Sequence, residues 1–172
     1  MNTFTIFDNN SLTQLYVEEE AYEGVKRIGA RVACDLGLVT GTEPGTVSAP
    51  CQCRSYRVVI FATLGRSPFL DALEASGRWS SAQIRGKREV YQMQVVREPF
   101  SALPSGKAVA ESGMTAVKEA LVIAGSDKRG TIYGMFRLSE LCGVSPLIYW
   151  GDVVPQKKDT VILPIGEGFV SK

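Results

Sequence analysis

Residues 120–146 read ALVIAGSDKRGTIYGMFRLSELCGVSP, and this segment carries the strongest indication of the fold class. Ala120–Ala124 is a short apolar run of the kind that forms a buried strand. A polar, glycine-containing turn follows at Gly125–Gly130, and apolar residues then recur at helical spacing as far as Gly143, where the helix is expected to stop. A buried strand that passes through such a turn into a helix is typical of α/β proteins.

Strand patterns occur on both sides of this segment. They are found at Thr3–Phe7, Leu12–Val17, Tyr56–Leu64, Glu89–Arg97 and Thr160–Leu163. A helix is expected to open at Glu18-Glu19-Glu20 and to close at Gly37 and Gly41, and a shorter one to follow Ser67 as its N-cap. Pro99–Met114 is rich in Ser, Gly and Ala and is interpreted as an inserted surface loop.

These patterns predict the fold class. Strands that alternate with helices indicate an α/β protein, here a single small layered domain with a central mixed sheet and helices packed on it. We expect the sheet to be built from the strands that carry Phe4, Val59, Tyr91 and Val122. The expected length of one domain, about 100–200 residues, accommodates the 172 residues of the chain.

Composition excludes several classes of function. Nineteen Lys and Arg against eighteen Asp and Glu leave a net charge of +1, so no nucleic-acid partner is expected. No apolar run reaches the roughly 18 residues of a membrane span, so no membrane partner is expected either. Residues 1–10 lack the basic and apolar regions of a signal peptide, and none is expected in this chain.

The chain contains no histidine. This excludes Ser-His and Cys-His nucleophile pairs and zinc sites that need His, and leaves carboxylates, Lys, Tyr and Cys as the possible catalytic groups. Of the four cysteines, only Cys51 and Cys53 are close in sequence, and C-x-C without a second pair fits zinc spacings poorly. We therefore expect no metal and no cofactor, and no catalytic residue is assigned.

The turn between the strand at Ala120–Ala124 and the helix after it is the first candidate site. A helix N-terminus binds anions, Lys128 and Arg129 add positive charge, and Arg129 could hold a carboxylate with two hydrogen bonds. The spacing matches neither a P-loop nor G-x-G-x-x-G. In the structural alternative, Ser126 or Asp127 caps the helix, and the glycines that follow allow close packing.

Trp150, beside Tyr149, is the second candidate. An aromatic face can stack on a sugar ring, and such a pair can equally pack a loop onto the core or onto a neighbouring domain. The residue pattern leaves both interpretations open. Candidate substrate-binding residues are thus Lys128, Arg129 and Trp150, and candidate capping residues are Ser126 and Asp127.

Residues 120–146 also closely resemble the hallmark segment of glycoside hydrolase family 115, the xylan α-1,2-glucuronidases. The family typically continues with W-A-D-V-P, where this chain has YWGDVVP at 149–155, one residue longer and with Gly151 in place of Ala. VTGTEP at 39–44 and IRGKREVYQMQVV at 84–96 are similar to the family's N-terminal domain, whereas Pro99–Met114 departs from it.

The resemblance implies an accessory α/β domain at 1–165, followed at 166–172 by the start of a linker to a (β/α)8 barrel. A similar domain lies beside the barrels of β-hexosaminidases and family 67 glucuronidases. A barrel alone needs about 250 residues, so 172 residues cannot hold both parts. Because the family's catalytic carboxylates lie on the barrel, the isolated chain is expected to be inactive.

The implied function is therefore a non-catalytic domain that braces the barrel and contributes to uronate binding. Its implied partners are that barrel and, in the full-length enzyme, glucuronoxylan-type carbohydrate, and the implied location of that enzyme is secreted or periplasmic. The alternative is a stand-alone carbohydrate- or anion-binding module.

Overall fold

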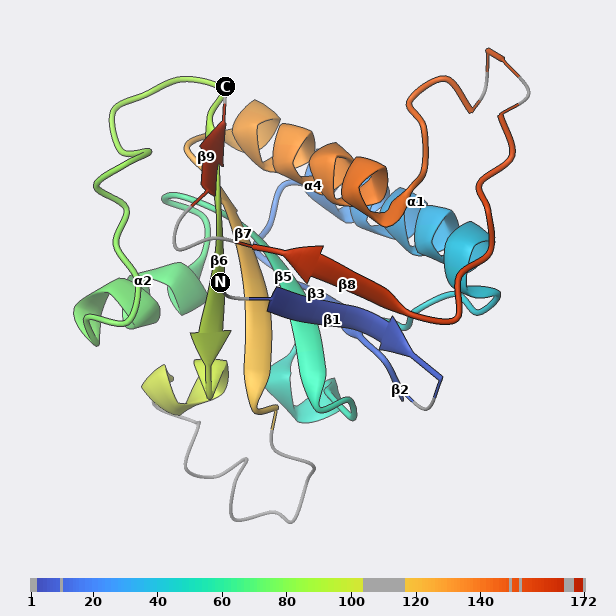
Figure 1. Ribbon diagram of the computed structural model, residues 1–172. Coiled ribbons are helices and arrows are strands. Elements are labelled where there is room, and N and C mark those ends of the chain that lie inside the picture. Colours follow the sequence, from blue (N-terminus) through green and yellow to red (C-terminus); the bar gives the residue numbers. More distant parts are fainter. Residues whose placement is uncertain are drawn as a thin grey trace.

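The computed structural model describes residues 3–9, 11–103, 117–148, 150–151, 153–165 and 169–171 (Figure 1). The strands are β1 (Thr3–Asp8), β2 (Ser11–Leu12), β3 (Gln14–Val17), β4 (Thr46–Val47), β5 (Arg57–Thr63), β6 (Tyr91–Arg97), β7 (Glu119–Gly125), β8 (Val161–Pro164) and β9 (Phe169–Ser171). The helices are α1 (Glu23–Thr40), α2 (Pro68–Ala75) and α4 (Lys128–Cys142), with 3₁₀ turns at Pro50–Gln52 and Pro99–Ala102.

A mixed six-stranded sheet in the order β4-β3-β5-β7-β6-β9 forms the centre of the molecule. β4, β3, β5 and β7 run parallel, while β6 is antiparallel to both of its neighbours. β5 and β7 are almost continuously apolar because both faces of the sheet are covered. The predicted fold class, a small α/β domain with a central mixed sheet and helices packed on it, is confirmed.

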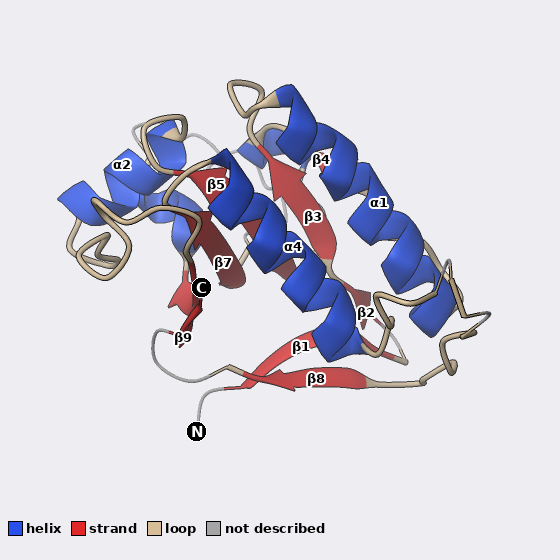
Figure 2. Ribbon diagram, turned by 90° about the horizontal axis from the view of Figure 1, so that it is seen from above, coloured by secondary structure: helices blue, strands red, loops and turns tan. Residues whose placement is uncertain are grey.

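The two faces of this sheet are covered by different elements. α1 and α4 lie side by side on one face, and α2 lies on the other (Figure 2). Val59 of β5 packs in the core beneath α1 and α4, whereas Val122 of β7 packs in the core beneath α2. The alternation of side chains along the strands thus divides the apolar residues between two cores.

The strand that carries Phe4 is not part of the central sheet, so this prediction is wrong. β1 pairs instead with β2 and β8 in a separate three-stranded sheet. Phe4 and Ile6 are fully buried in the same core as residues of α1 and α4, because one face of the small sheet contributes to that core. An alternating pattern shows that one face of a strand is buried but not against which sheet it is buried.

The first helix begins at Glu23 and not at Glu18, which corrects a second prediction. Glu18 follows β3 directly, and a tight turn in which the N–H of Ala21 donates to the Glu18 carbonyl separates it from the helix. The Glu18 side chain is buried, at 6% exposure, and the run of three acids therefore does not lie on one solvated helical turn.

The ends of the other helices agree with the sequence. Ser67 caps α2 by accepting from the N–H of Leu70, and Gly143 ends α4 with a φ of 106° that favours glycine. Of the predicted surface loop Pro99–Met114, residues 104–114 lie outside the described residues, whereas Pro99 and Phe100 at its start are buried in a 3₁₀ turn. Of the predicted linker, 166–168 and 172 lie outside the described residues. Residues 169–171 of that linker form β9 against β6. No helix in the described ranges has the length and apolar character needed to cross a membrane.

Candidate functional site

Asp127 lies at the N-cap of α4 and fixes the turn that the sequence singles out. Its carboxylate accepts from the N–H of Gly130 at 2.8 Å and from the N–H of Glu89 at 2.9 Å. Burial acts to raise the pKa of Asp127, but these backbone donors outweigh it and leave the pKa below its ordinary value. The charged carboxylate therefore joins the start of α4 to the segment before β6.

Ser126 holds the same segment from the other side of the turn. Its hydroxyl accepts from the N–H of Val90 at 3.2 Å, and its N–H donates to the Val90 carbonyl at 2.9 Å. A Cβ atom on Gly130 would lie 2.2 Å from that carbonyl oxygen, so only glycine fits there. Glu89 and Val90 thus lie directly against the first turn of α4.

Arg129 and Lys128 both point toward solvent at this end of α4. The Arg129 guanidinium is 69% exposed and pairs with the Glu89 carboxylate at 2.7 Å, which raises the pKa of Arg129. Lys128 is exposed, and its Cδ would lie 3.8 Å from a Cβ on Gly24 of α1. The two cations are neighbours on the surface, and Arg129 has a carboxylate partner within the domain.

Trp150 lies in the turn after α4 and is 87% exposed, while Tyr149 lies outside the described residues. The N–H of Trp150 donates to the Leu147 carbonyl at 2.9 Å, which fixes the turn. α4 has 15 residues and separates Trp150 from Arg129 by a helix about 22 Å long. The structure therefore does not bring Trp150 together with Lys128 and Arg129.

Glu18 forms a buried polar contact with Ser67 and Phe69, which the sequence does not indicate because these residues lie about 50 positions away. Its carboxylate accepts from the Ser67 hydroxyl and, at 2.9 Å, from the N–H of Phe69. Burial raises the pKa of Glu18 above its ordinary value, although both hydrogen bonds act to lower it. The contact joins the end of β3 to the first turn of α2.

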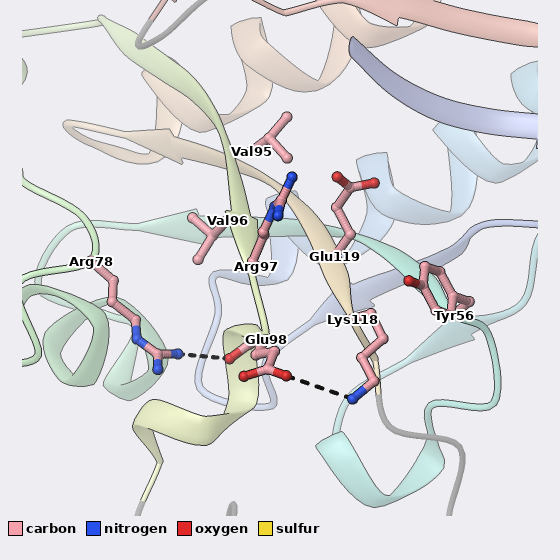
Figure 3. Close-up of a pocket in the computed structure, with 8 residues that line it drawn as sticks. All are labelled: Tyr56, Arg78, Val95, Val96, Arg97, Glu98, Lys118 and Glu119. Atoms are coloured by element: carbon pink, nitrogen blue, oxygen red, sulfur yellow. Dashed lines mark hydrogen bonds and ion pairs between the residues drawn. The ribbon is translucent and has the colours of Figure 1, made fainter. Parts of the chain in front are cut away.

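An open hollow of about 730 Å³ lies at the other end of the central sheet, where β6 ends and β5 and β7 begin (Figure 3). We call it the Arg97 hollow. It is lined by Tyr56, Arg78, Val95, Val96, Arg97, Glu98, Lys118 and Glu119. Because β7 runs from Glu119 to Gly125, the hollow and the turn after Gly125 lie at opposite ends of that strand.

The backbone under the Arg97 hollow is held at Glu98. This residue has a φ of 47°, which is uncommon for a residue other than glycine. Its N–H donates to the Lys118 carbonyl at 2.8 Å, and its carbonyl accepts from the Arg78 guanidinium at 2.8 Å. The N–H of Lys118 in turn donates to the Tyr56 carbonyl at 2.9 Å. Surrounding contacts of this kind hold a strained residue in place.

Charged side chains and one aromatic ring face this hollow. Lys118 pairs with Glu98 at 3.6 Å. Arg97 and Glu119 lie directly opposite each other on β6 and β7, and Figure 3 shows both reaching to the same side of the strands without a bond between them. Among the described residues, no ion pair or hydrogen bond engages either of these two side chains. Tyr56 is 54% exposed at the hollow's edge.

This arrangement presents a hydrogen-bond donor, an acceptor and an aromatic ring to a small polar molecule. The sequence did not indicate it, because Arg97 only ends an alternating strand and Glu119 only precedes a buried one. Their pairing depends on the antiparallel register of β6 and β7, and a one-residue shift would move one of them to the other face. Among the described residues, no group of three or more Cys, Asp or Glu side chains could hold a metal ion.

The fold resembles part of a known enzyme. No family model matches the chain, and no curated protein matches it. A solved structure of a family GH115 4-O-methyl-α-glucuronidase with specificity for decorated arabinogalactans is similar, with 23% identity and a TM-score of 0.62. The similarity covers 99% of this chain and 18% of that chain. The fold described above therefore recurs as one part of a larger glycoside hydrolase.

Proposed function

We propose that this chain is a non-catalytic domain of a glycoside hydrolase related to the family 115 α-glucuronidases and that it packs beside the catalytic barrel. The observation that carries the proposal is the likeness over 99% of this chain to only 18% of a much longer enzyme. The sequence resemblance of residues 120–146 supports the same family independently of the fold.

The chemistry of the chain agrees with a supporting role. It has no histidine, and glycoside hydrolysis normally needs two carboxyl groups that face one substrate across about 5–10 Å. The Glu18 carboxyl group is buried in a structural contact, and Asp127 is used as a helix cap. Both carboxylates therefore stabilise the domain itself.

An exposed apolar loop supports packing against another domain. Leu147, Trp150 and Val154 are all more than half exposed within eight residues of sequence. A Cβ on Gly151 would contact both Val153 and Leu147, so these side chains are neighbours in space. Exposed apolar residues that lie close together mark an interaction site, and the barrel domain is the proposed partner.

In the longer enzyme, the proposed activity is release of glucuronic acid or its 4-O-methyl ether from a polysaccharide such as glucuronoxylan, in a secreted or periplasmic location. Lys128 and Arg129 are proposed to contribute a contact to the uronate, and Trp150 to lie at the domain boundary.

The proposal is tested by purifying the polypeptide that carries this sequence from its natural host with antibodies raised against the 172-residue chain. We expect a polypeptide or complex several times larger than the chain that releases 4-O-methylglucuronic acid from glucuronoxylan or arabinogalactan. The 172-residue chain alone should release none above a buffer control. Recovery of a free chain without an associated glucuronidase activity, or turnover by the chain alone, would contradict the proposal.

A further inference from the structure

We infer that the Arg97 hollow binds an acidic sugar, such as a uronic acid, as a second carbohydrate-binding site outside the catalytic barrel. The choice of a sugar acid over other carboxylates rests on the proposed function. The site itself rests on the side chains that line the hollow.

The first argument is the state of the Arg97 and Glu119 side chains. They stand opposite each other on β6 and β7, at the distance of about 5 Å between Cβ atoms that usually lets opposite charges interact. Within the part of the chain that the structure describes, neither is engaged in an ion pair or side-chain hydrogen bond. A guanidinium and a carboxylate are therefore both available, side by side, at one wall of an open hollow (Figure 3).

The second argument is that one ligand class satisfies both groups. The Arg97 guanidinium pairs best with a carboxylate, which it can hold with two hydrogen bonds. The Glu119 carboxylate only accepts hydrogen bonds and would repel a second carboxylate, so it requires hydroxyl donors on the ligand. A molecule with a carboxylate at one end and several hydroxyl groups beside it meets both requirements. Inorganic phosphate or acetate meets only the first.

The third argument is the aromatic ring at the edge of the hollow. Tyr56 is 54% exposed, and its carbonyl is fixed by the N–H of Lys118. The C–H face of a sugar ring packs on an aromatic side chain of this kind, whereas a fully charged small anion gains nothing from it. Lys118 adds positive charge but is already paired with Glu98.

The hollow is also large enough for a monosaccharide unit, and contacts within the domain hold its base in place. Its volume of about 730 Å³ falls within the range of about 300–1,000 Å³ that small-molecule sites occupy. Arg78 is held by the Glu98 carbonyl, and Glu98 itself is held by Lys118, so the base of the hollow is fixed before a ligand arrives.

The test is titration of the 172-residue chain with sodium D-glucuronate, followed by calorimetry or by amide chemical shifts. Glucose, sodium acetate and inorganic phosphate are titrated in parallel, and an oligosaccharide that ends in glucuronic acid separates a polysaccharide end from the free acid. We expect glucuronate or the oligosaccharide to bind most tightly. Binding should weaken as salt is raised, because the contact is exposed to solvent.

Two variants and a control locate the site. R97Q should weaken glucuronate binding by about tenfold or more, and E119Q should weaken glucuronate binding without weakening any acetate binding, because it removes a charge that repels acetate. Arg137→Gln is the matched control, because Arg137 is a partly exposed arginine paired with Glu140 on α4, away from the hollow. Thermal unfolding of each variant verifies that the fold is kept.

Three results would overturn the inference: no binding of either sugar acid at tens of millimolar, binding that R97Q leaves unchanged, or phosphate binding as tightly as glucuronate. Loss of binding in R129Q but not in R97Q would place the sugar at the start of α4 instead. These results leave the proposed function intact, since that is tested by the size and activity of the host polypeptide.

Discussion

The Glu18 carboxyl group is buried between β3 and α2, and its pKa is raised by burial. Since the folded protein binds this proton more tightly than the unfolded chain, the stability that Glu18 contributes is full below the unfolded pKa of about 4.5 and falls as the pH rises through the folded pKa. Glu18→Gln, which keeps an acceptor for the N–H of Phe69, should therefore be at least as stable as the parent at pH 7. The difference in free energy of unfolding between Glu18→Gln and the parent, measured by urea unfolding, should vanish near pH 4.

Glu18→Ala provides the opposite test of this contact, because it leaves the Ser67 hydroxyl and the N–H of Phe69 without their partner. A loss of about 1–3 kcal/mol in the free energy of unfolding is expected. Glu20→Gln is the control, since Glu20 is exposed beside the same turn. If the parent gained stability relative to Glu18→Gln as the pH rises, the buried carboxylate would be favoured in its charged form, contrary to the prediction.

Asp127 should show the reverse dependence on pH. Its pKa is lowered in the folded protein, so its contribution is present above the ordinary pKa of 3.8 and is lost as the pH falls through the folded value. Asp127→Ala is expected to cost about 1–2 kcal/mol at pH 7 through loss of the N-cap, and less below pH 3. Arg129→Ala breaks only an exposed pair and should cost much less than Asp127→Ala. Equal costs for the two variants would contradict the prediction that the cap contributes more to the turn than the ion pair does.

At the scale of elements, the packing of α4 against the segment before β6 depends on Gly130. A methyl group there would lie 2.2 Å from the Val90 carbonyl oxygen, which is backbone and cannot turn away. Gly130→Ala is therefore expected to destabilise the protein by about 1–3 kcal/mol or more. Differential scanning calorimetry of the two proteins measures this change.

Gly24→Ala is the matched control, because Gly24 also lies in the first turn of a helix. The nearest atoms to its added methyl group would be 3.8 Å away, at ordinary contact distance. Reduced freedom of the unfolded chain should then stabilise this variant by up to about 1 kcal/mol. A Gly130→Ala protein as stable as Gly24→Ala would mean that the segment before β6 does not press on α4.

The elements that could be predicted from sequence are those with strong local signals. The Ala120–Ala124 run, the Ser67 cap and the stop at Gly143 each act through neighbouring residues, and each lies where the sequence places it. The position of β1 could not be predicted, because its partner β8 is more than 150 residues away. The Arg97 hollow could not be predicted for a different reason, because it depends on the register between β6 and β7, which the local pattern of neither strand specifies.

At the scale of the whole molecule, the small sheet joins distant parts of the chain. Phe4 of β1 pairs with Leu163 of β8, and both are buried in the core beneath α1 and α4. One end of the central sheet carries the turn at Asp127, which is occupied by contacts within the domain. In the Arg97 hollow at the other end, the side chains of Arg97 and Glu119 make no such contact with the described residues. The exposed Trp150 loop lies apart from both, and these three surfaces can therefore serve different roles.

Trp150 tests the contact between this domain and the rest of a longer enzyme. The chain has two tryptophans, of which Trp79 is 3% exposed and Trp150 is 87% exposed. In the 172-residue chain, acrylamide should therefore quench Trp150 strongly, and Trp150→Phe should leave a blue-shifted, poorly quenched emission from Trp79.

Because Trp150 makes few contacts, Trp150→Ser should change the free energy of unfolding of the isolated chain by about 0.5 kcal/mol or less. In the longer enzyme the same substitution should cost about 2 kcal/mol or more, since a buried tryptophan at an interface contributes that much. Unfolding of both proteins with and without the substitution measures the difference, and equal small costs in the two would mean that no other domain covers this loop.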